Sequence, residues 1–307
     1  MENQQSQRIR SAVFDWLNSI NYQYPDRVIP SSVLTNDCII NGERIILSGA
    51  QGIWKPRQLQ YPISIKSVAD SIYQDAQLDN NLIHYKYRGT DPNLYVNVGL
   101  RECMHQRIPL VYLHQVSKGK YLVEWPVFIV ADDPKNLTFT VEANSNQISL
   151  SSEPNITEEP DEMQRRYATR QMIQRLHQGT FRERVLEAYR EHCAICRLKH
   201  RQLLDAAHII EDSKGGKPVV QNGLSLCKIH HAAFDNNIIG ITPDYQIQVR
   251  EDILQEIDGP MLKHGIQEMH GNKLILPRSA NLKPKQEWLE ERYEVFKKLN
   301  LELIIQI

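Results

Sequence analysis

The chain has 307 residues, of which 41% are hydrophobic and 24% are charged. This balance is typical of folded globular proteins and excludes a disordered or collagen-like chain. Lys and Arg number 36 against 37 Asp and Glu, so the formal net charge is −1 and the chain as a whole is no polycation. A nucleic-acid partner would therefore have to meet a local basic patch.

Length and hydropathy also bound the domain count and the location. At roughly 100 to 200 residues per domain, the length predicts two domains. No apolar run approaches the roughly 18 residues of a membrane-spanning helix, and the polar first residues lack the apolar core of a secretory signal. We therefore expect a cytoplasmic protein with no membrane partner.

An acidic segment divides the chain. Residues 151–162 contain five acidic residues, two prolines and no basic residue, which is typical of an interdomain linker. We therefore predict an N-terminal domain over residues 1–150 and a C-terminal domain over residues 163–307. The charge balance reverses after the linker, because residues 163–217 carry 12 Lys or Arg and six Asp or Glu.

Helical and strand-like patterns alternate in the N-terminal domain. Residues 8–18 place four apolar side chains on one helical face, which predicts a helix. Short strand-forming runs and one further helical run follow, so this domain is predicted to be α+β with a mixed sheet. The predicted strands are residues 44–47, 109–114, 121–125 and 127–130, and the second helix is residues 97–106. In the C-terminal domain, helices are predicted over residues 164–176, 181–192 and 285–299.

A four-residue Cys and His pattern lies in the C-terminal domain: Cys193 and Cys196 form one pair, and Cys227 and His230 form another. Each two-residue spacing lets a pair reach one ion, and two such pairs complete the four-ligand shell of structural zinc. A disulfide conflicts with the expected cytoplasmic location, and a redox pair would need no second pair with a histidine. We predict Zn²⁺ bound by these four residues, with a metal-free buried cluster and redox chemistry as the alternatives.

Three short motifs accompany these pairs: AAHI at residues 206–209, NGL at 222–224 and HxxFD at 231–235. Together with the metal pairs, they resemble the HNH, or ββα-metal, endonucleases, in a subtype found in predicted bacterial restriction enzymes. The resemblance covers about residues 189–240 and maps the three defining positions to His208, Asn222 and His231. It implies that the C-terminal domain is a zinc-stabilised ββα-metal nuclease domain.

The chemistry of the three residues agrees with this resemblance. A neutral imidazole accepts a proton from water at physiological pH, which makes His208 the expected general base. Asn222 precedes a glycine and its amide can bond backbone on both sides, so we expect it to hold the hairpin and His208 in place. Successive helical residues point about 100° apart, so His230 can bind zinc while His231 binds a catalytic Mg²⁺ or Mn²⁺ ion at the scissile phosphate.

Two carboxylates are candidates for supporting that ion. Many members of the family have an acid immediately before the base histidine, where this chain has Ala207. Asp205 lies two residues earlier on the same strand face and is the candidate second ligand, with a turn cap as the alternative. Asp235 follows His231 by one helical turn and is expected to orient its imidazole, with helix-end capping as the alternative.

Contacts with DNA are expected from both domains. Basic residues near the motif are candidates for neutralising phosphates, namely Arg165, Arg166, Arg197, Lys199 and Arg201. In the N-terminal domain, a pocket for a flipped base, as in modified-base readers of the SRA or PUA-like type, would draw on Tyr85, Tyr87, Arg88 and Asp91. Alternatively, the two tyrosines are sheet residues, residues 89–93 form a turn, and the domain is a platform for dimerisation or sequence reading. The sequence does not choose between these interpretations.

The leading hypothesis is a restriction-type endonuclease that acts on double-stranded DNA and is directed to modified DNA by its N-terminal domain. Cutting both strands with one active site per chain would suit a homodimer, although sequential nicking would also suffice. The alternative from another class is a noncatalytic, zinc-stabilised DNA-binding or regulatory module. A third hypothesis makes the N-terminal domain a sensor for a small molecule.

Overall fold

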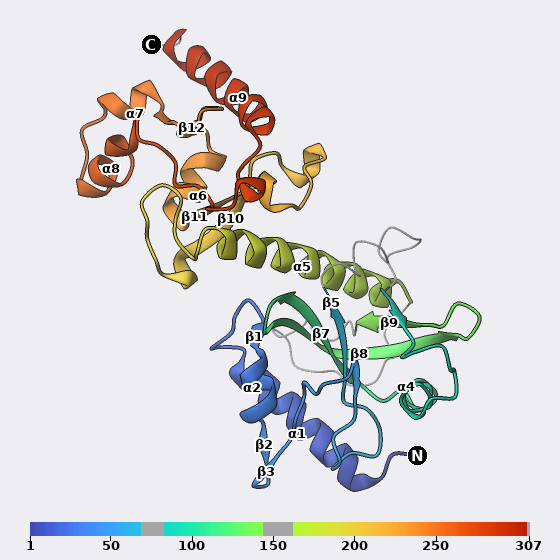
Figure 1. The fold of residues 1–307 in the computed structure, drawn as a ribbon. Coiled ribbons are helices and arrows are strands. Elements are labelled where there is room, and N and C mark those ends of the chain that lie inside the picture. The colour runs from blue at the N-terminus through green and yellow to red at the C-terminus, as the bar shows by residue number, and fades with distance from the viewer. Residues whose placement is uncertain (69–82, 144–161, 306–307) are drawn as a thin grey trace. The chain divides into compact units, whose positions relative to one another are not determined.

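The computed structural model describes residues 1–68, 83–143 and 162–305 (Figure 1). The fold is mixed α+β, as the sequence predicts. It comprises two compact units, Met1–Thr180 and Phe181–Ile307. The division falls inside a single helix, α5 (Glu162–Ala188). No helix in these described ranges is both long and apolar enough to cross a membrane.

A seven-stranded sheet forms the centre of the first unit, in the order β4-β5-β7-β8-β9-β6, with β1 also pairing with β8. The pairing is parallel between β5 and β7 and antiparallel elsewhere. The strands are β1 (Val28–Pro30), β4 (Ile53–Trp54), β5 (Ser64–Val68), β6 (Ile83–Lys86), β7 (Leu110–Ser117), β8 (Lys120–Asp133) and β9 (Thr138–Ala143). A separate hairpin comprises β2 (Ile39–Ile40) and β3 (Glu43–Arg44).

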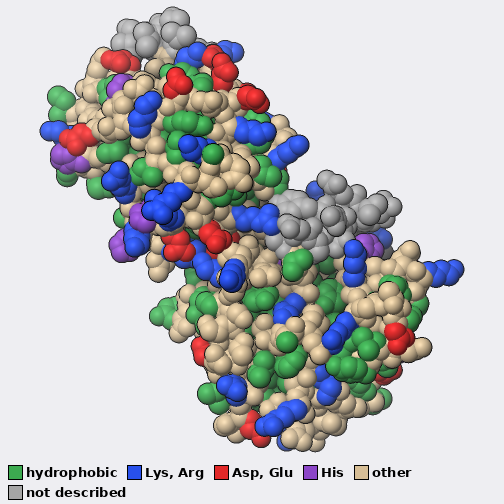
Figure 2. Space-filling view, in the orientation of Figure 1, with side chains coloured by type: hydrophobic (Ala, Val, Ile, Leu, Met, Phe, Trp, Pro, Cys, Tyr) green, Lys and Arg blue, Asp and Glu red, His purple; other side chains and the backbone are tan. Residues whose placement is uncertain are grey.

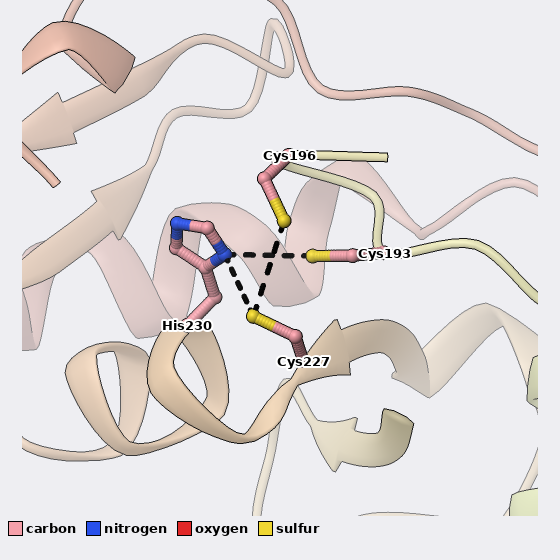
Figure 3. A group of neighbouring side chains, drawn as sticks. All are labelled: Cys193, Cys196, Cys227 and His230. Carbon is pink, nitrogen blue, oxygen red and sulfur yellow. Dashed lines mark hydrogen bonds between the residues drawn. The ribbon is translucent and has the colours of Figure 1, made fainter. Parts of the chain in front are cut away.

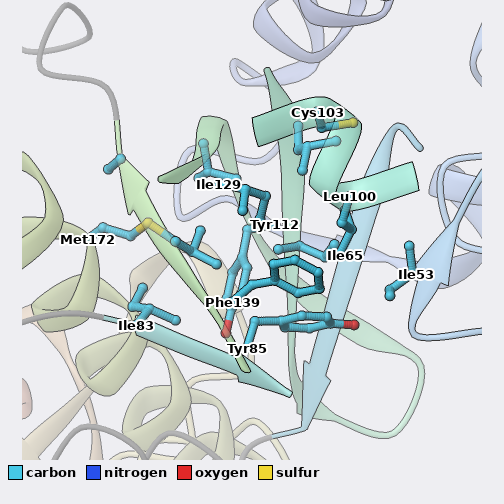
Figure 4. Packing of buried hydrophobic residues seen from close by; sticks show 14 of the residues in the cluster. Ile53, Ile65, Ile83, Tyr85, Leu100, Cys103, Tyr112, Ile129, Phe139 and Met172 are labelled. Carbon is cyan, nitrogen blue, oxygen red and sulfur yellow. The ribbon is translucent and has the colours of Figure 1, made fainter. Parts of the chain in front are cut away.

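Both faces of this sheet carry a hydrophobic core, because side chains alternate along β7. Val111 and Leu113 pack in a core that includes Val13 and Leu17, which are fully buried on α1 (Gln4–Ile20). α2 (Ser31–Asn36) contributes to the same core. Tyr112 packs in the other core, which α4 (Tyr95–His105) also joins (Figure 4).

Two elements are longer than the sequence predicts. The runs predicted at residues 121–125 and 127–130 form one strand, β8, which continues through Pro126. Close to this proline, the pairing of β8 with β7 shifts register between Leu110 and Tyr112. The two helices predicted on either side of Gly179 form one helix, α5. A Cβ on Gly179 would lie 2.2 Å from Cδ1 of Leu122. The glycine therefore serves close packing of α5 on β8 and does not end the helix.

One predicted strand is largely absent. Of residues 44–47, only Arg44 belongs to a strand. The backbone N–H groups of Ile45 and Leu47 donate to the carbonyls of Cys38 and Leu34 instead. These bonds satisfy the backbone of a buried, irregular segment without a continuous ladder.

The first part of α5 belongs to the core of the first unit. Ala168, Met172 and Leu176 are buried in that core, whereas Phe181 belongs to the core of the second unit. The compact units therefore divide after Thr180, whereas the sequence predicts a linker at residues 151–162. Residues 151–161 of that predicted linker lie outside the described ranges.

The second unit is built on a two-stranded hairpin followed by a short helix, and its core includes Phe234 and Leu289. Near its C-terminus, a Cβ on Gly240 would lie 2.5 Å from Phe296, so the glycine lets α9 pack against β12. The elements are β10 (Leu204–His208), β11 (Gly223–Cys227), α6 (Lys228–Asp235), β12 (Ile239–Ile241), β13 (Ile247–Val249), α7 (Glu251–Gln255), α8 (Pro260–Gly265) and α9 (Gln286–Ile305).

Candidate active site and metal centre

The four predicted zinc ligands converge on one point (Figure 3). Nδ1 of His230 lies 3.1 Å from Sγ of Cys227 and 3.5 Å from Sγ of Cys193. The sulfur atoms of Cys196 and Cys227 are 3.9 Å apart. All four ligand atoms lie within 4.8 Å of one another, so these residues form a potential metal site.

Local backbone structure brings the two pairs together. The N–H of Arg197 donates to the carbonyl of Cys193 at 3.0 Å, which closes a tight turn around the first pair. The N–H of Ala194 donates to the carbonyl of Ser225 at 2.7 Å and ties this turn to β11. Cys227 lies at the N-cap of α6, so His230 follows on the first turn of the helix.

The donor set fits a structural zinc ion. Three thiols and one imidazole are a usual ligand set for Zn²⁺. The second ring nitrogen of His230, Nε2, lies 2.7 Å from the carbonyl oxygen of Gly265, which fixes the ring as is common for metal-bound histidines. Burial alone would lower the pKa of His230, but hydrogen bonds with Cys193 and Cys227 raise it to about 10, so binding of zinc to this imidazole would release a proton.

His208 lies at the end of β10, opposite Gly223 of β11. Its ring stacks on Phe181 with 4.0 Å between centroids and 11° between planes. Its Nε2 is buried and, among the described residues, has no hydrogen-bond partner. Burial lowers the pKa of His208 from its ordinary 6.5, with further effects from Asp212, His231 and Asp235. The ring is therefore neutral at physiological pH.

Asn222 is fully buried and clamps the loop between β10 and β11. Its Oδ1 accepts from the N–H of Ile210 at 2.9 Å. Its Nδ2 donates to the carbonyls of Ile210 at 2.9 Å and Lys217 at 3.0 Å. The Asn222 carbonyl also accepts from the N–H of Ile209, the residue after His208. These bonds fix the backbone on both sides of the loop and next to His208.

His231 lies on α6 between two carboxylates. Its Nδ1 is 3.6 Å from Oδ2 of Asp205, and its Nε2 is 3.2 Å from Oδ2 of Asp235. The neighbouring Asp205 carboxylate raises the pKa of His231, against the effect of burial. The structure thus places the two carboxylates that the sequence singles out on either side of this imidazole.

Asp205 also contacts two cations, of which sequence reasoning missed Lys228. Lys228 Nζ lies 2.7 Å from Oδ2, and Arg182 Nε lies 3.5 Å from Oδ1. Burial opposes ionisation of Asp205, but the contacts with His231 and Lys228 outweigh it and lower its pKa. Asp205 is therefore an ionised carboxylate at neutral pH, as a metal ligand must be. The position of Lys228, beside Cys227 at the start of the predicted helix, was the available sequence signal.

A second missed residue, Arg292 on α9, supports the end of α6. Its guanidinium donates to the carbonyls of Phe234 at 2.7 Å and Asp235 at 3.3 Å, and to Oδ1 of Asn237 at 2.7 Å. The same group lies 4.9 Å from the centroid of the Phe234 ring. Carbonyls at a helix C-terminus lack partners within the helix, so this arginine satisfies them.

The predicted phosphate-contacting residues differ in their availability. Arg197 and Lys199 are exposed in the second unit, whereas Arg201 forms ion pairs with Glu183 and Glu191. In the first unit, Arg166 is exposed and Arg165 is half-buried on α5. On the faces that Figure 2 shows, Lys and Arg side chains are spread over each unit.

The candidate base-contacting residues of the first unit are divided between core and surface. Tyr85 and Tyr87 are buried in the sheet core, which is where the alternative interpretation places them. The Tyr87 hydroxyl bonds with Asp132 and accepts from Arg101 at 3.2 Å. Arg88 and Asp91 are exposed. Their loop is held by buried Asn97, whose Nδ2 donates to the carbonyls of both residues.

The two strands and the helix around His208, Asn222 and His231 lie in a segment that matches a known family. Residues 193–242 match the family model described as HNH endonuclease. The resemblance inferred from the three motifs is thereby confirmed for this part of the chain. The HNH segment contains both metal pairs and the three motif residues, and it spans β10, β11 and α6. No curated protein matched the chain.

Solved structures similar to the chain include two restriction endonucleases. One is described as a modification dependent TagI restriction endonuclease, with 15% identity, a TM-score of 0.28, and coverage of 76% of this chain and 81% of that one. The other is described as the Type IV phosphorothioation-dependent restriction endonuclease ScoMcrA, with 15% identity and a TM-score of 0.21. That match covers 78% of this chain and 50% of the other.

Proposed function

We propose that this protein is a metal-dependent endonuclease that hydrolyses phosphodiester bonds in double-stranded DNA. One observation carries the proposal. Within an HNH endonuclease segment, a neutral imidazole lies at the end of β10, and a second imidazole lies between two carboxylates on the adjoining helix. A base and a cation-binding pair are the two parts that metal-assisted hydrolysis of a phosphodiester needs.

In this proposal, His208 accepts a proton from the water that attacks phosphorus. Its lowered pKa keeps the ring unprotonated at physiological pH, and stacking on Phe181 limits the orientations of the ring. Asn222 positions His208 by fixing the backbone at Ile209 and Ile210. Asn222 therefore acts through the backbone that follows β10 and not on the substrate.

His231 and Asp205 would hold a divalent ion, Mg²⁺ or Mn²⁺. The donor set fits, because one imidazole nitrogen and one ionised carboxylate oxygen lie 3.6 Å apart. Such an ion would supply positive charge to the phosphate and to the leaving oxygen. Asp235 orients His231 from its other ring nitrogen.

The Cys193, Cys196, Cys227 and His230 site would bind Zn²⁺ as a structural ion. Its four donors close the coordination shell and leave no place for substrate. The ion would join the turn before β10 to the start of α6. It would thus hold the helix that carries His231 against the hairpin that carries His208.

The first unit is proposed to select the DNA, including modified DNA, and a homodimer is proposed for cutting both strands. Matched plasmids test target selection: unmodified, methylated, hydroxymethylated and phosphorothioated, each with Mg²⁺ or Mn²⁺. Size measurement in solution, with and without DNA, tests the dimer. Equal cleavage of all four plasmids would reject selection by modification.

The catalytic proposal is tested with His208→Ala. We expect cleavage to fall by roughly 100-fold to 10,000-fold, the usual contribution of a general base. His264→Ala is the matched control, because His264 is an exposed histidine of the same unit that pairs with Glu268 at 2.8 Å. Equal cleavage by His208→Ala and wild type would reject the mechanism. DNA binding without metal-dependent nicking by wild type would instead support the noncatalytic module.

A further inference from the structure

The first unit has a hollow on its surface that none of the roles above uses. It lies between the β2–β3 hairpin and residues 54–58 and has a volume of about 840 Å³. Ligand pockets commonly measure roughly 300 to 1,000 Å³. Its lining includes three basic residues, one acidic residue, Glu43, and one aromatic residue.

The three basic residues of this hollow are Arg44, Lys55 and Arg57, and all three are exposed. Within the described parts of the chain, no carboxylate forms an ion pair with any of them. Lys55 Nζ donates to the carbonyl of Leu59 at 3.1 Å, which leaves two of its N–H bonds for a ligand. Cations concentrated in a concave surface attract anions, and guanidinium groups suit phosphate oxygens.

Trp54 forms a rigid wall of the same hollow. Its indole N–H donates to the carbonyl of Ile46 at 2.8 Å. Its ring lies directly against Gly49, where a Cβ would be 1.9 Å from Cε3. The glycine is therefore required for this close approach, and the half-buried ring has a fixed orientation before any ligand arrives.

Backbone structure fixes the cations on either side. Asn41 and Gly42 have φ of 52° and 79°, as in the tight turn of a two-residue hairpin, and this turn sets the position of Arg44. Leu59 N donates to the carbonyl of Pro56 at 3.1 Å, which puts Arg57 inside a turn. The two sides of the hollow are thus built from short, ordered turns.

We propose that this hollow binds one nucleotide of a DNA strand, with a phosphate near Arg44 and Arg57 and a base against Trp54. A planar aromatic wall beside unpaired cations matches a nucleotide, because bases stack on aromatic rings while phosphates take charge-assisted hydrogen bonds. An acidic peptide would use the cations and leave the indole without a function. The choice of DNA as the source rests on the proposed function of the protein.

The test compares two charge-matched double variants of the full chain. Arg44→Gln/Arg57→Gln removes two cations from the hollow. Arg8→Gln/Lys118→Gln removes two exposed cations elsewhere in the same unit. Binding of a short fluorescein-labelled duplex is followed by anisotropy over a range of salt concentrations, without added Mg²⁺ or Mn²⁺. We expect the hollow variant to bind at least tenfold more weakly and its salt slope to fall by roughly 0.9, the contribution of the one phosphate that loses its cationic partners.

Equal affinity and equal salt slope in the two double variants would overturn the proposal. Trp54→Phe and Trp54→Leu test the stacking role, after thermal unfolding shows that both fold. The phenyl variant should keep most of the affinity, and the leucine variant should lose roughly fivefold to a hundredfold. Equal binding by both would also overturn it. Competition by poly-glutamate as effective as competition by DNA of equal charge would show a general anion site and reject nucleotide recognition.

Two further measurements distinguish a free nucleotide from a DNA strand as the ligand of the hollow. Deoxynucleoside monophosphates titrated by calorimetry test a free nucleotide, and duplex and single-stranded oligonucleotides test a DNA strand. The hollow variant could lose binding of monophosphates while its DNA binding is unchanged. That result would show that the hollow binds a free nucleotide and would reject a DNA strand as its ligand. The readout is binding, so it is independent of cleavage: a wild-type protein that binds through the hollow but cuts no DNA would contradict the proposed function alone.

Discussion

Asn222→Asp is the sharpest test of the loop clamp between β10 and β11. The substitution keeps the size of the side chain and keeps Oδ1, which accepts from the N–H of Ile210. It replaces the Nδ2 donor with an oxygen that faces the carbonyls of Ile210 and Lys217. Two hydrogen bonds are lost. The new side-chain oxygen faces the two backbone carbonyl oxygens, so three acceptors lie together without a donor at a fully buried position.

The magnitude follows from these contacts. Each lost hydrogen bond contributes about 1 kcal/mol, and leaving buried acceptors without donors adds to that. We therefore expect the free energy of unfolding to fall by about 3 kcal/mol, which corresponds to a melting temperature lower by about 10 °C. Cleavage should fall as well, because the clamp holds the backbone beside His208.

Thermal unfolding followed by circular dichroism measures the first effect, and initial rates of plasmid cleavage measure the second. Asn281→Asp is the matched control, because Asn281 is exposed and its Oδ1 accepts from Ser279 at 2.6 Å, a role that Asp retains. If Asn222→Asp unfolded at the wild-type temperature, the amide donor would not hold this loop. The positioning role assigned to Asn222 would then be wrong.

Three further predictions concern other parts of the molecule. Because burial lowers the pKa of His208, its ring becomes protonated only below the ordinary value of 6.5. The acid limb of kcat/KM against pH should therefore lie below pH 6.5 when Mg²⁺ or Mn²⁺ is saturating, so that the ion and not a proton occupies His231. An acid limb centred above 6.5 would contradict this assignment. Cys196→Ser should release zinc, measured by a colorimetric chelator, and lower the melting temperature of the second unit, since metal binding contributes to folding. Unchanged metal content and an unchanged melting temperature would refute the proposed zinc site. Gly179→Ala should lower stability by about 1 to 3 kcal/mol through overpacking against Leu122, and adding Leu122→Ala should make the glycine substitution less costly. Additive effects of the two changes in chemical denaturation would show that they do not share this contact.

Local sequence patterns predicted the metal-ligand cluster and two helices of the first unit. The spacing of Cys193, Cys196, Cys227 and His230 predicted a cluster that the structure brings together. The helix predicted over residues 8–18 and the helix predicted over residues 97–106 are present as α1 and α4. These features depend on spacing within a few residues or on a repeated apolar face, which a single sequence records directly.

Features that depend on distant packing were not predicted. A glycine is common at the end of a helix, yet Gly179 lies inside α5. Its missing side chain leaves the space that Leu122 occupies. Arg201 was predicted to contact phosphate, but it forms ion pairs with Glu183 and Glu191. No local sequence pattern indicates these two ion pairs. Tyr85 was a candidate for a pocket because of its loop-like neighbours, but the sheet pairing of β6 with β9 places it in the core.

Arg292 supports the matched HNH segment from outside it. Its guanidinium completes the end of α6 from a helix that starts more than 40 residues after the matched segment ends at residue 242. A fragment trimmed to the motif alone would leave the carbonyls of Phe234 and Asp235 without this partner, one turn from His231. A fragment that is to keep this end of α6 intact should therefore extend through α9, since the last helix supports the helix that carries His231.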